Sequence, residues 1–424
     1  MSVLAILIFI AGYALITFEH RYKVNKSITA TALAGIIWAL IALSGDTHVH
    51  ESLHMISAET FALVVFLLAA MTLVEVLVHY RFFDLLRVRL YELGLKDNAQ
   101  LILISAIAFV LSAIIDNLTT TIVMVQIARR FFKGKNLLIA AGSIVVAANA
   151  GGAFSPIGDV TTIMLWLAGK FSALEVIAWG FLPALALFLV STFLFVRQIV
   201  RDSGDDEAPT TFEHITLSRS ERVVITATFA SFALPPLAHL LHLPPFMGLL
   251  LGVGIVGLII GFFANAFSRR ESHLSLEIEK IMGKVDITSL LFFIGILFSV
   301  GALSHLGILA SISESLFGDS PSLMRLVSGS VLLGAFSAIV DNIPLTAAAI
   351  EILSTSNPHL WVLLAICVGT GGSMLVIGSA AGVVAMGMVK ELTFKNYFKI
   401  AALPAAAGYV AAIAVWALQY FLFG

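Results

Sequence analysis

The chain has 424 residues, of which 59% are hydrophobic and only 12% are charged, and its formal net charge is −2. A water-soluble domain carries about 25% charged residues, so this composition excludes a soluble globule and predicts a polytopic membrane protein in a lipid bilayer. The near-neutral charge gives no sign of nucleic-acid binding. The single cysteine, Cys367, excludes an intrachain disulfide and a cysteine-based metal cluster.

Eight apolar runs have the length of a membrane-spanning helix, about 17–25 residues. The basic residues beside the first run follow it rather than precede it, which is not the layout of a signal peptide. In chain order the runs lie at about 2–18, 28–44, 59–80, 173–197, 221–241, 245–266, 287–304 and 400–423. Histidines 48, 50 and 54 fall between runs and are expected in an outer loop.

Four further apolar stretches do not fit that length. Residues 99–132 and 323–353 are each too long for one helix and too short for two crossings, so we expect re-entrant hairpins. Residues 137–169 and 360–389 are long crossings interrupted by Gly-Gly pairs, so we expect helices broken near the midplane. Unpaired backbone groups are tolerated at that depth only where they are buried in protein or line a cavity.

The two halves of the chain carry matching motifs. Residues 111–121 (LSAIIDNLTTT) and 336–346 (FSAIVDNIPLT) are identical at six of eleven positions. Residues 149–162 (NAGGAFSPIGDVTT) and 369–382 (GTGGSMLVIGSAAG) share Gly-Gly and, four residues later, Ile-Gly. An ionisable residue at membrane depth is costly and marks a functional site by default. A duplicated one beside broken helices is typical of a transporter site between two repeats.

The basic residues orient the chain. If residues 99–132 and 323–353 are hairpins, every Lys and Arg except Lys170 and Arg325 falls on one side of the membrane. The positive-inside rule makes that side cytoplasmic and places both termini outside, in the periplasm. Five crossings then separate equivalent points of the two repeats, and an odd number makes the repeats inverted.

We therefore predict an all-α polytopic fold with two inverted-topology repeats, about ten full spans, two re-entrant hairpins and two broken helices. The expected parts are N-terminal scaffold helices (1–58), repeat 1 (59–197), linkers and helices between the repeats (198–286) and repeat 2 (287–424). Residues 198–220 and 267–286 are expected as polar cytoplasmic linkers.

Oxygen-bearing side chains gather at the hairpin tips and helix breaks, and oxygen atoms are the ligands of hard cations. They are Asp116, Asn117, Thr119, Thr120, Thr121, Asn149, Ser155, Asp159, Thr161 and Thr162 in the first repeat, and Ser337, Asp341, Asn342, Thr346, Thr370, Ser373 and Ser379 in the second. Three are acids, and the four motifs contain no Lys or Arg. Each acid can hold a proton or be neutralised by a cation, and competition between the two is sufficient for antiport.

Purely structural interpretations compete with the interpretation as an ion site. A lone Asp in a membrane helix can be a structural hydrogen-bonding residue, and a lone Gly-Gly pair usually serves helix packing, but duplication at matched spacing disfavours both. Glu75, near the cytoplasmic end of run 59–80, is a weaker candidate for a proton-linked residue, because its side chain can also snorkel to the interface.

The four motifs resemble the signatures of sodium/proton antiporters of the NhaD type, within the Ion Transporter superfamily, and the resemblance covers about residues 28–420. It implies a scaffold part, a moving transport part, an elevator-like movement, a homodimer and exchange of Na⁺ or Li⁺ for H⁺. It assigns functional polar residues to Asp116, Asn117, Asn149, Asp159, Thr161, Thr162, Ser337, Asp341, Asn342 and Ser373.

We therefore expect a multi-pass antiporter of the bacterial-type inner membrane, without enzymatic activity, that exports Na⁺ and Li⁺ for H⁺. Na⁺ is expected at Asp116, Asp159 and Asp341, with no cofactor beyond the transported ions. The alternative is an anion or oxyanion carrier of the same fold, for arsenite or a carboxylate, insensitive to neutralising Asp159. A membrane-embedded enzyme would need a Ser/His or acid/His set at depth, and the two histidines away from loops, His239 and His305, lack partner spacing in the sequence.

Overall fold

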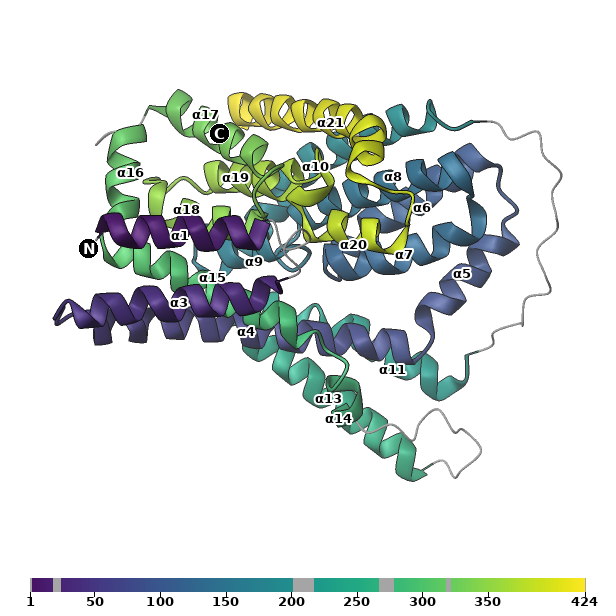
Figure 1. Ribbon diagram of the computed structural model, residues 1–424. Coiled ribbons are helices and arrows are strands. Elements are labelled where there is room, and N and C mark those ends of the chain that lie inside the picture. Colours follow the sequence, from purple (N-terminus) through teal and green to yellow (C-terminus); the bar gives the residue numbers. More distant parts are fainter. Residues whose placement is uncertain (1, 18–23, 201–216, 267–277, 318–321, 424) are drawn as a thin grey trace.

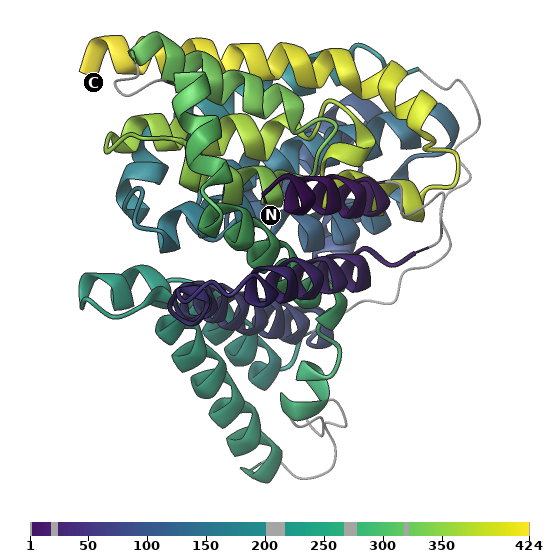
Figure 2. The ribbon, with the colours of Figure 1, turned by 60° about the vertical axis from the view of Figure 1, so that its left-hand side comes forward.

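The computed structural model describes residues 2–17, 24–200, 217–266, 278–317 and 322–423, and every regular element in these ranges is helical. Eight of the described helices are long and apolar enough to cross a membrane. The all-α polytopic prediction is therefore confirmed. The helices form two groups that lie one above the other in both views (Figure 1, Figure 2).

The lower group, which we call the scaffold, comes from the N-terminal and central parts of the chain. Its helices are α3 (Lys26–Leu43), α4 (Val49–His79), α11 (Arg219–Ser231), α12 (Leu234–Leu240), α13 (Pro245–Ala266), α14 (Ile278–Met282) and α15 (Ile287–His305). Helices α1 (Ser2–Thr17) and α16 (Ile308–Phe317) lie higher, at the level of the upper group (Figure 1). We count both with the scaffold, because α1 packs along α3 and α16 packs against α15 as well as α18. Helix α3 packs along α15, and α4 packs against α13 and α15. Helix α5 (Phe82–Glu92) connects this group to the upper one (Figure 1).

The upper group, which we call the repeat body, contains the two motif-bearing halves. The first half is α6 (Asp97–Ser112), α7 (Asn117–Phe131), α8 (Gly134–Ala153), α9 (Val160–Leu167) and α10 (Ala173–Val196). The second half is α17 (Leu323–Phe336), α18 (Asn342–Ile352), α19 (Pro358–Gly371), the short 3₁₀ turn η2 (Val376–Gly378), α20 (Ala380–Met388) and α21 (Phe394–Phe423). Each half is thus a hairpin, a broken helix and a long helix, in that order.

The hairpin arms are too short to cross a bilayer. Helices α6 and α7 have 16 and 15 residues, and α17 and α18 have 14 and 11, against the roughly 17 to 25 that a span needs. Both hairpins turn at the Asp-Asn dipeptide, immediately before α7 and α18. The predicted re-entrant hairpins are therefore present.

The two repeats run in opposite directions. The Nε2 of Gln198, just after α10, donates to the carbonyl of Ile400, near the start of α21, at 3.0 Å. At the far end, the ring of Trp179 stacks on His359 with centroids 3.7 Å apart, and Trp416 Nε1 donates to the His359 carbonyl at 3.0 Å. The end of α10 therefore meets the start of α21, and these equivalent helices are antiparallel (Figure 1).

The glycine pairs let each broken helix touch its hairpin. A Cβ on Gly151 would lie 2.0 Å from the Phe109 carbonyl oxygen, and one on Gly371 would lie 1.8 Å from the Gly334 oxygen. Such contacts exclude any side chain at these two positions. Nearby, Ser112 Oγ donates to the Ala148 carbonyl at 2.6 Å, and the equivalent serine of repeat 2 makes the corresponding bond to α19 at 2.9 Å.

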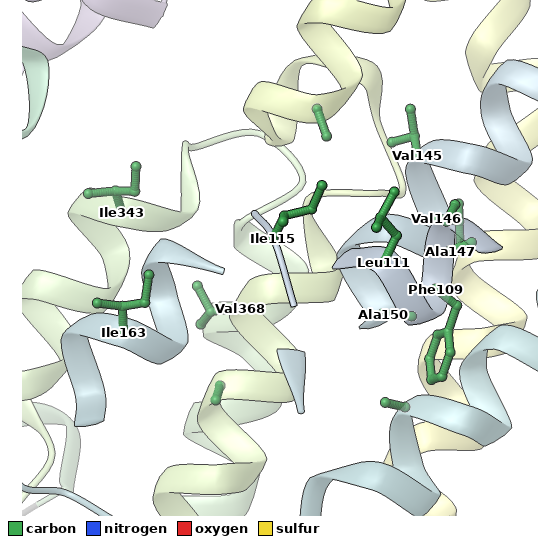
Figure 3. Packing of buried hydrophobic residues seen from close by; sticks show 14 of the residues in the cluster. Phe109, Leu111, Ile115, Val145, Val146, Ala147, Ala150, Ile163, Ile343 and Val368 are labelled. Carbon is green, nitrogen blue, oxygen red and sulfur yellow. The ribbon is translucent and has the colours of Figure 1, made fainter. Parts of the chain in front are cut away.

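Apolar packing surrounds these breaks. Leu111 of α6 lies beside Val145 and Val146 of α8, while Ile163 of α9 and Ile343 of α18 lie side by side on neighbouring helices (Figure 3). All five side chains are buried. The two repeats share one continuous core, which also takes in scaffold side chains such as Leu73 of α4 and Phe292 of α15.

One predicted loop was wrong. Helix α4 begins at Val49, so His50 and His54 lie on a helix rather than in a loop. The predicted span 221–241 is present as the apolar stretch Arg219–Leu240, but it consists of two helices, α11 and α12, separated at Phe232–Ala233. Two prolines open α12, and proline cannot continue the backbone hydrogen-bond ladder. Most of the predicted linkers 198–220 and 267–286 lies outside the described residues.

Candidate functional site

Four half-helices begin at the middle of the repeat body, each with a predicted site residue at its N-cap. Asp116 caps α7, Asp159 caps α9, Asp341 caps α18 and Ser379 caps α20. Each side chain accepts from a backbone N–H of its own helix, at 2.8, 3.4, 3.4 and 3.2 Å respectively. A helix N-terminus carries partial positive charge, which stabilises a carboxylate placed there. The fold thus compensates part of the cost of these buried acids.

A cavity of about 70 Å³ lies where the repeat body meets the scaffold. Its lining includes Asp116, Asp159 and Asp341 together with their neighbours Asn117 and Asn342. Apolar scaffold side chains from α4 and α15 complete it. The structure therefore brings the acids of both repeats to one water-sized space.

Asp159 is the most enclosed of the three acids, at 1% exposure. Its Oδ2 has no hydrogen-bond partner within the described part of the chain, and the hydroxyls of Thr120, Thr121 and Thr161 are buried without a partner in the same sense. Buried polar atoms are almost always satisfied by protein, water or an ion. These oxygens are therefore candidate ligands for a cation or water.

Asn149 ties the two repeats together. Its Nδ2 donates to Ser373 Oγ at 2.8 Å and to Ser379 Oγ at 3.1 Å, and its Oδ1 accepts from Asn117 Nδ2 at 3.0 Å. Asn149 is fully buried. The amide therefore fixes the relative position of a hairpin tip in one repeat and a helix break in the other.

The other predicted hydroxyls bond to nearby chain. Thr119 Oγ1 donates to Asp116 Oδ2 at 2.7 Å, which holds that carboxylate. Ser155, Thr162, Ser337, Thr346 and Thr370 donate to the backbone carbonyls of Ala113, Gly152, Val368, Asn342 and Ile366. These hydroxyls pair backbone carbonyls in and around the helix breaks and so stabilise them.

The three carboxylates line the cavity but do not converge on a common position. No three Asp, Glu, His or Cys residues of the described ranges come together as a metal site. Glu75 lies on α4 outside the cavity lining, with Lys284 as its charged neighbour. Its proton-linked role stays a prediction.

Sequence reasoning missed a cation at the site. The Lys26 ammonium, at the first residue of α3, lies 4.0 Å from Asp341 Oδ2 and lines the same cavity. Tyr13 of α1 also interacts with Asp341, including its backbone. The motifs carry no signal for either residue, because both belong to the scaffold.

His305 has partners that its sequence neighbourhood does not reveal. Its Nε2 lies 3.0 Å from Asp46 Oδ2, and its Nδ1 lies 2.7 Å from Ser52 Oγ. These partners are more than 250 residues away in the chain, and the fold brings them together by packing α15 against the α3–α4 turn. This trio ties the scaffold helices together at the end away from Lys26, and none of its members lines the cavity.

The fold and the site define a multi-pass membrane transporter built from inverted repeats. Residues 13–369 match a family model described as a citrate transporter, CitMHS. The chain is 37% identical over 419 residues to "Sodium/proton antiporter 1" of Arabidopsis thaliana, an alignment that covers 97% of this chain and 71% of that protein. It is 33% identical over 450 residues to "Na(+)/H(+) antiporter NhaD" of Halomonas elongata, covering 97% and 87%.

A solved structure shares the fold. The Alcanivorax borkumensis YdaH transporter superposes with a TM-score of 0.61 at 13% identity, covering 94% of this chain and 99% of that one. At that identity the likeness concerns the fold alone. The sequence matches place the protein more narrowly: it belongs to the family of NhaD-type sodium/proton antiporters.

Proposed function

We propose that the protein is a secondary antiporter that exports Na⁺, and Li⁺, in exchange for H⁺. One observation carries this proposal: three carboxylates cap half-helices around one cavity, and Asp159 Oδ2 points to no protein donor in the described ranges. Such an oxygen is suited to a proton or to a hard cation. The antiporter names of the relatives agree with this chemistry.

In this mechanism, Na⁺ and H⁺ compete for the same carboxylates. Asp159 contributes its bare oxygen, and the buried hydroxyl of Thr161 lies two residues away on the same helix turn. Asp116 and Asp341 face the cavity from the two hairpin tips. A bound cation offsets negative charge at the site on one side of the membrane, and bound protons offset it on the other. In both forms the site crosses the bilayer with less negative charge than the bare carboxylates carry.

The citrate description of the family model calls for a test of the anion alternative. Helix N-termini bind anions through their free N–H groups, and four of them converge here. Three are already occupied by the protein's own carboxylates, at Asp116, Asp159 and Asp341. A tricarboxylate placed in this cavity would meet those negative charges, so the cation is the better fit.

The position of the cavity supports alternating access. Its scaffold lining lies toward one end of each helix: Lys26 opens α3, Phe292 lies in the second turn of α15, and the α4 lining runs from Leu67 to Val74, in the second half of that helix. The positive-inside pattern assigns these ends to the cytoplasmic side. The site thus stands at the inner half of the scaffold, as in an inward-facing carrier. An elevator-like shift of the repeat body would carry it outward.

The setting of the proposed carrier is a bacterial-type inner membrane, with both termini in the periplasm. The distribution of Lys and Arg supports this orientation. Large apolar side chains such as Leu258 and Phe262 of α13 are exposed at 76% and 69%, which suits contact with lipid or with a second copy. A homodimer completes the proposal by resemblance to the family.

Proton movement in everted vesicles that lack other antiporters tests this function. We expect NaCl and LiCl to dissipate a preformed pH gradient, while citrate and arsenite do not. Asp159→Asn should abolish the response. A wild-type protein that ignores every cation but moves citrate or arsenite would show that the anion alternative is correct.

A further inference from the structure

Lys26 joins the scaffold to the moving acid of the repeat body. Its ammonium lies 4.0 Å from Asp341 Oδ2, and the two side chains are 28% and 18% exposed. The same ammonium lies over the Phe292 ring of α15, 4.8 Å from the centroid, a cation–π contact that holds it at this place. Two scaffold helices, α3 and α15, therefore present a positive charge to the tip of the second hairpin.

The Lys26 ammonium stands beside Asp341 in the place that a bound cation would take. An ammonium beside a carboxylate supplies the positive charge that a bound Na⁺ would supply, and Lys26 lines the same cavity as all three acids. Phe292, Val74 and Asp116 complete the surroundings without adding a second cation to the described lining. The Lys26 ammonium thus offsets part of the negative charge of the carboxylates at this cavity.

The pair is also specific to one position of the repeat body. Lys26 is fixed at the end of α3 by its helix, whereas Asp341 travels with α17 and α18. Movement of the repeat body by even one helical turn, about 5.4 Å, would separate the two groups. The ion pair can exist only while the site faces the scaffold's Lys26 end.

We propose that Lys26 is an internal counter-ion that occupies Asp341 in the inward-facing state and is displaced by the arriving Na⁺. This inference rests on the proposed antiport. Lys26 sets the affinity for cytoplasmic Na⁺, because every cation that binds must first separate the ammonium from Asp341. It also stabilises the empty carrier in the orientation that collects Na⁺.

Kinetics in everted vesicles, whose medium contacts the cytoplasmic face, test the proposal. Lys26→Gln should lower the apparent KM for Na⁺ by roughly two- to fivefold, the range of a partly exposed ion pair. Lys26→Arg, which keeps the charge, should retain the wild-type KM. The matched control is Lys135→Gln, an exposed lysine on α8. An unchanged or raised KM in Lys26→Gln, or the same shift in Lys26→Arg, would overturn the proposal.

A second measurement needs no variant. Purified wild-type protein is pulsed with an amine acylating reagent in choline chloride or in NaCl, and lysine modification is read by mass spectrometry. Displacement predicts that Na⁺ raises the labelling of Lys26 and leaves that of Lys135 unchanged. Equal or lower labelling of Lys26 in NaCl would contradict displacement. If wild-type vesicles show no Na⁺-driven response at all, the antiport proposal fails instead.

Discussion

Gly369 lies directly against Asp159, so that a Cβ on the glycine would be 2.8 Å from the carboxylate Oδ2. The two residues belong to different repeats, and their equivalents, Asn149 and Ser379, are also in contact, at 3.1 Å. The inverted repeats thus cross at two points. At one point Asn149 donates a hydrogen bond to Ser379. At the other, the missing side chain of Gly369 leaves room for the Asp159 carboxylate.

Gly369→Ala should impair transport more than folding. The added methyl group would push the Asp159 carboxylate from its position, and we expect at least roughly a tenfold loss in kcat/KM for Na⁺, by analogy with the cost of misplacing a functional group. Gly387→Ala is the matched control, because nothing lies within 4 Å of its Cβ. Equal activity of both variants would show that the carboxylate position is not critical.

Replacing an N-cap aspartate by asparagine removes the charge while keeping the helix cap. Asn caps a helix about as well as Asp, so Asp116→Asn and Asp341→Asn should accumulate and melt like the wild type. Both should lose Na⁺-dependent proton exchange, because the neutral amide cannot hold a proton or balance a cation. The measurement is dye dequenching in everted vesicles beside thermal unfolding in detergent. Retained exchange in either variant would remove that residue from the site.

Asn149→Ala should weaken the link between the repeats. The change removes bonds to Asn117, Ser373 and Ser379 and leaves buried partners unsatisfied, at a cost of about 1–3 kcal/mol. We expect a lower melting temperature for the purified protein and reduced exchange. Asn98→Ala, at an exposed position of α6, should change neither. A wild-type melting curve for Asn149→Ala would argue against this role.

Asp46 makes the contact at the scaffold end away from Lys26 dependent on pH. Hydrogen bonds from the His48 backbone and from His305 lower the pKa of the Asp46 carboxyl below its usual value. A lowered pKa adds stability above the unfolded value, about 3.9, and that stability is lost as pH falls through the folded pKa. Asp46→Asn should therefore lower the melting temperature at pH 7 to 9, and the difference should shrink below about pH 4. A difference that is independent of pH would refute this dependence.

The sequence indicated the class of protein and named most residues of the candidate site. Composition required a membrane protein, because so few charges cannot solvate a globule. The duplicated Asp-Asn and Gly-Gly motifs located both hairpins and both breaks, since helix interruption and buried acids are readable locally. His50 and His54 were expected in a loop but lie on α4. The helix break just before Pro235 was not predicted. Both differences arise because hydropathy reports apolar length and not helix continuity.

Tertiary structure alone decided which distant groups meet. That Gly369 makes room for Asp159, that Asn149 joins the repeats, and that Lys26 pairs with Asp341 all depend on packing between segments far apart in the chain. No local pattern encodes such contacts, because the helices that bear these residues are equally apolar on many faces. The crossing of two inverted repeats, and the place where the scaffold closes on them, fix these contacts in space.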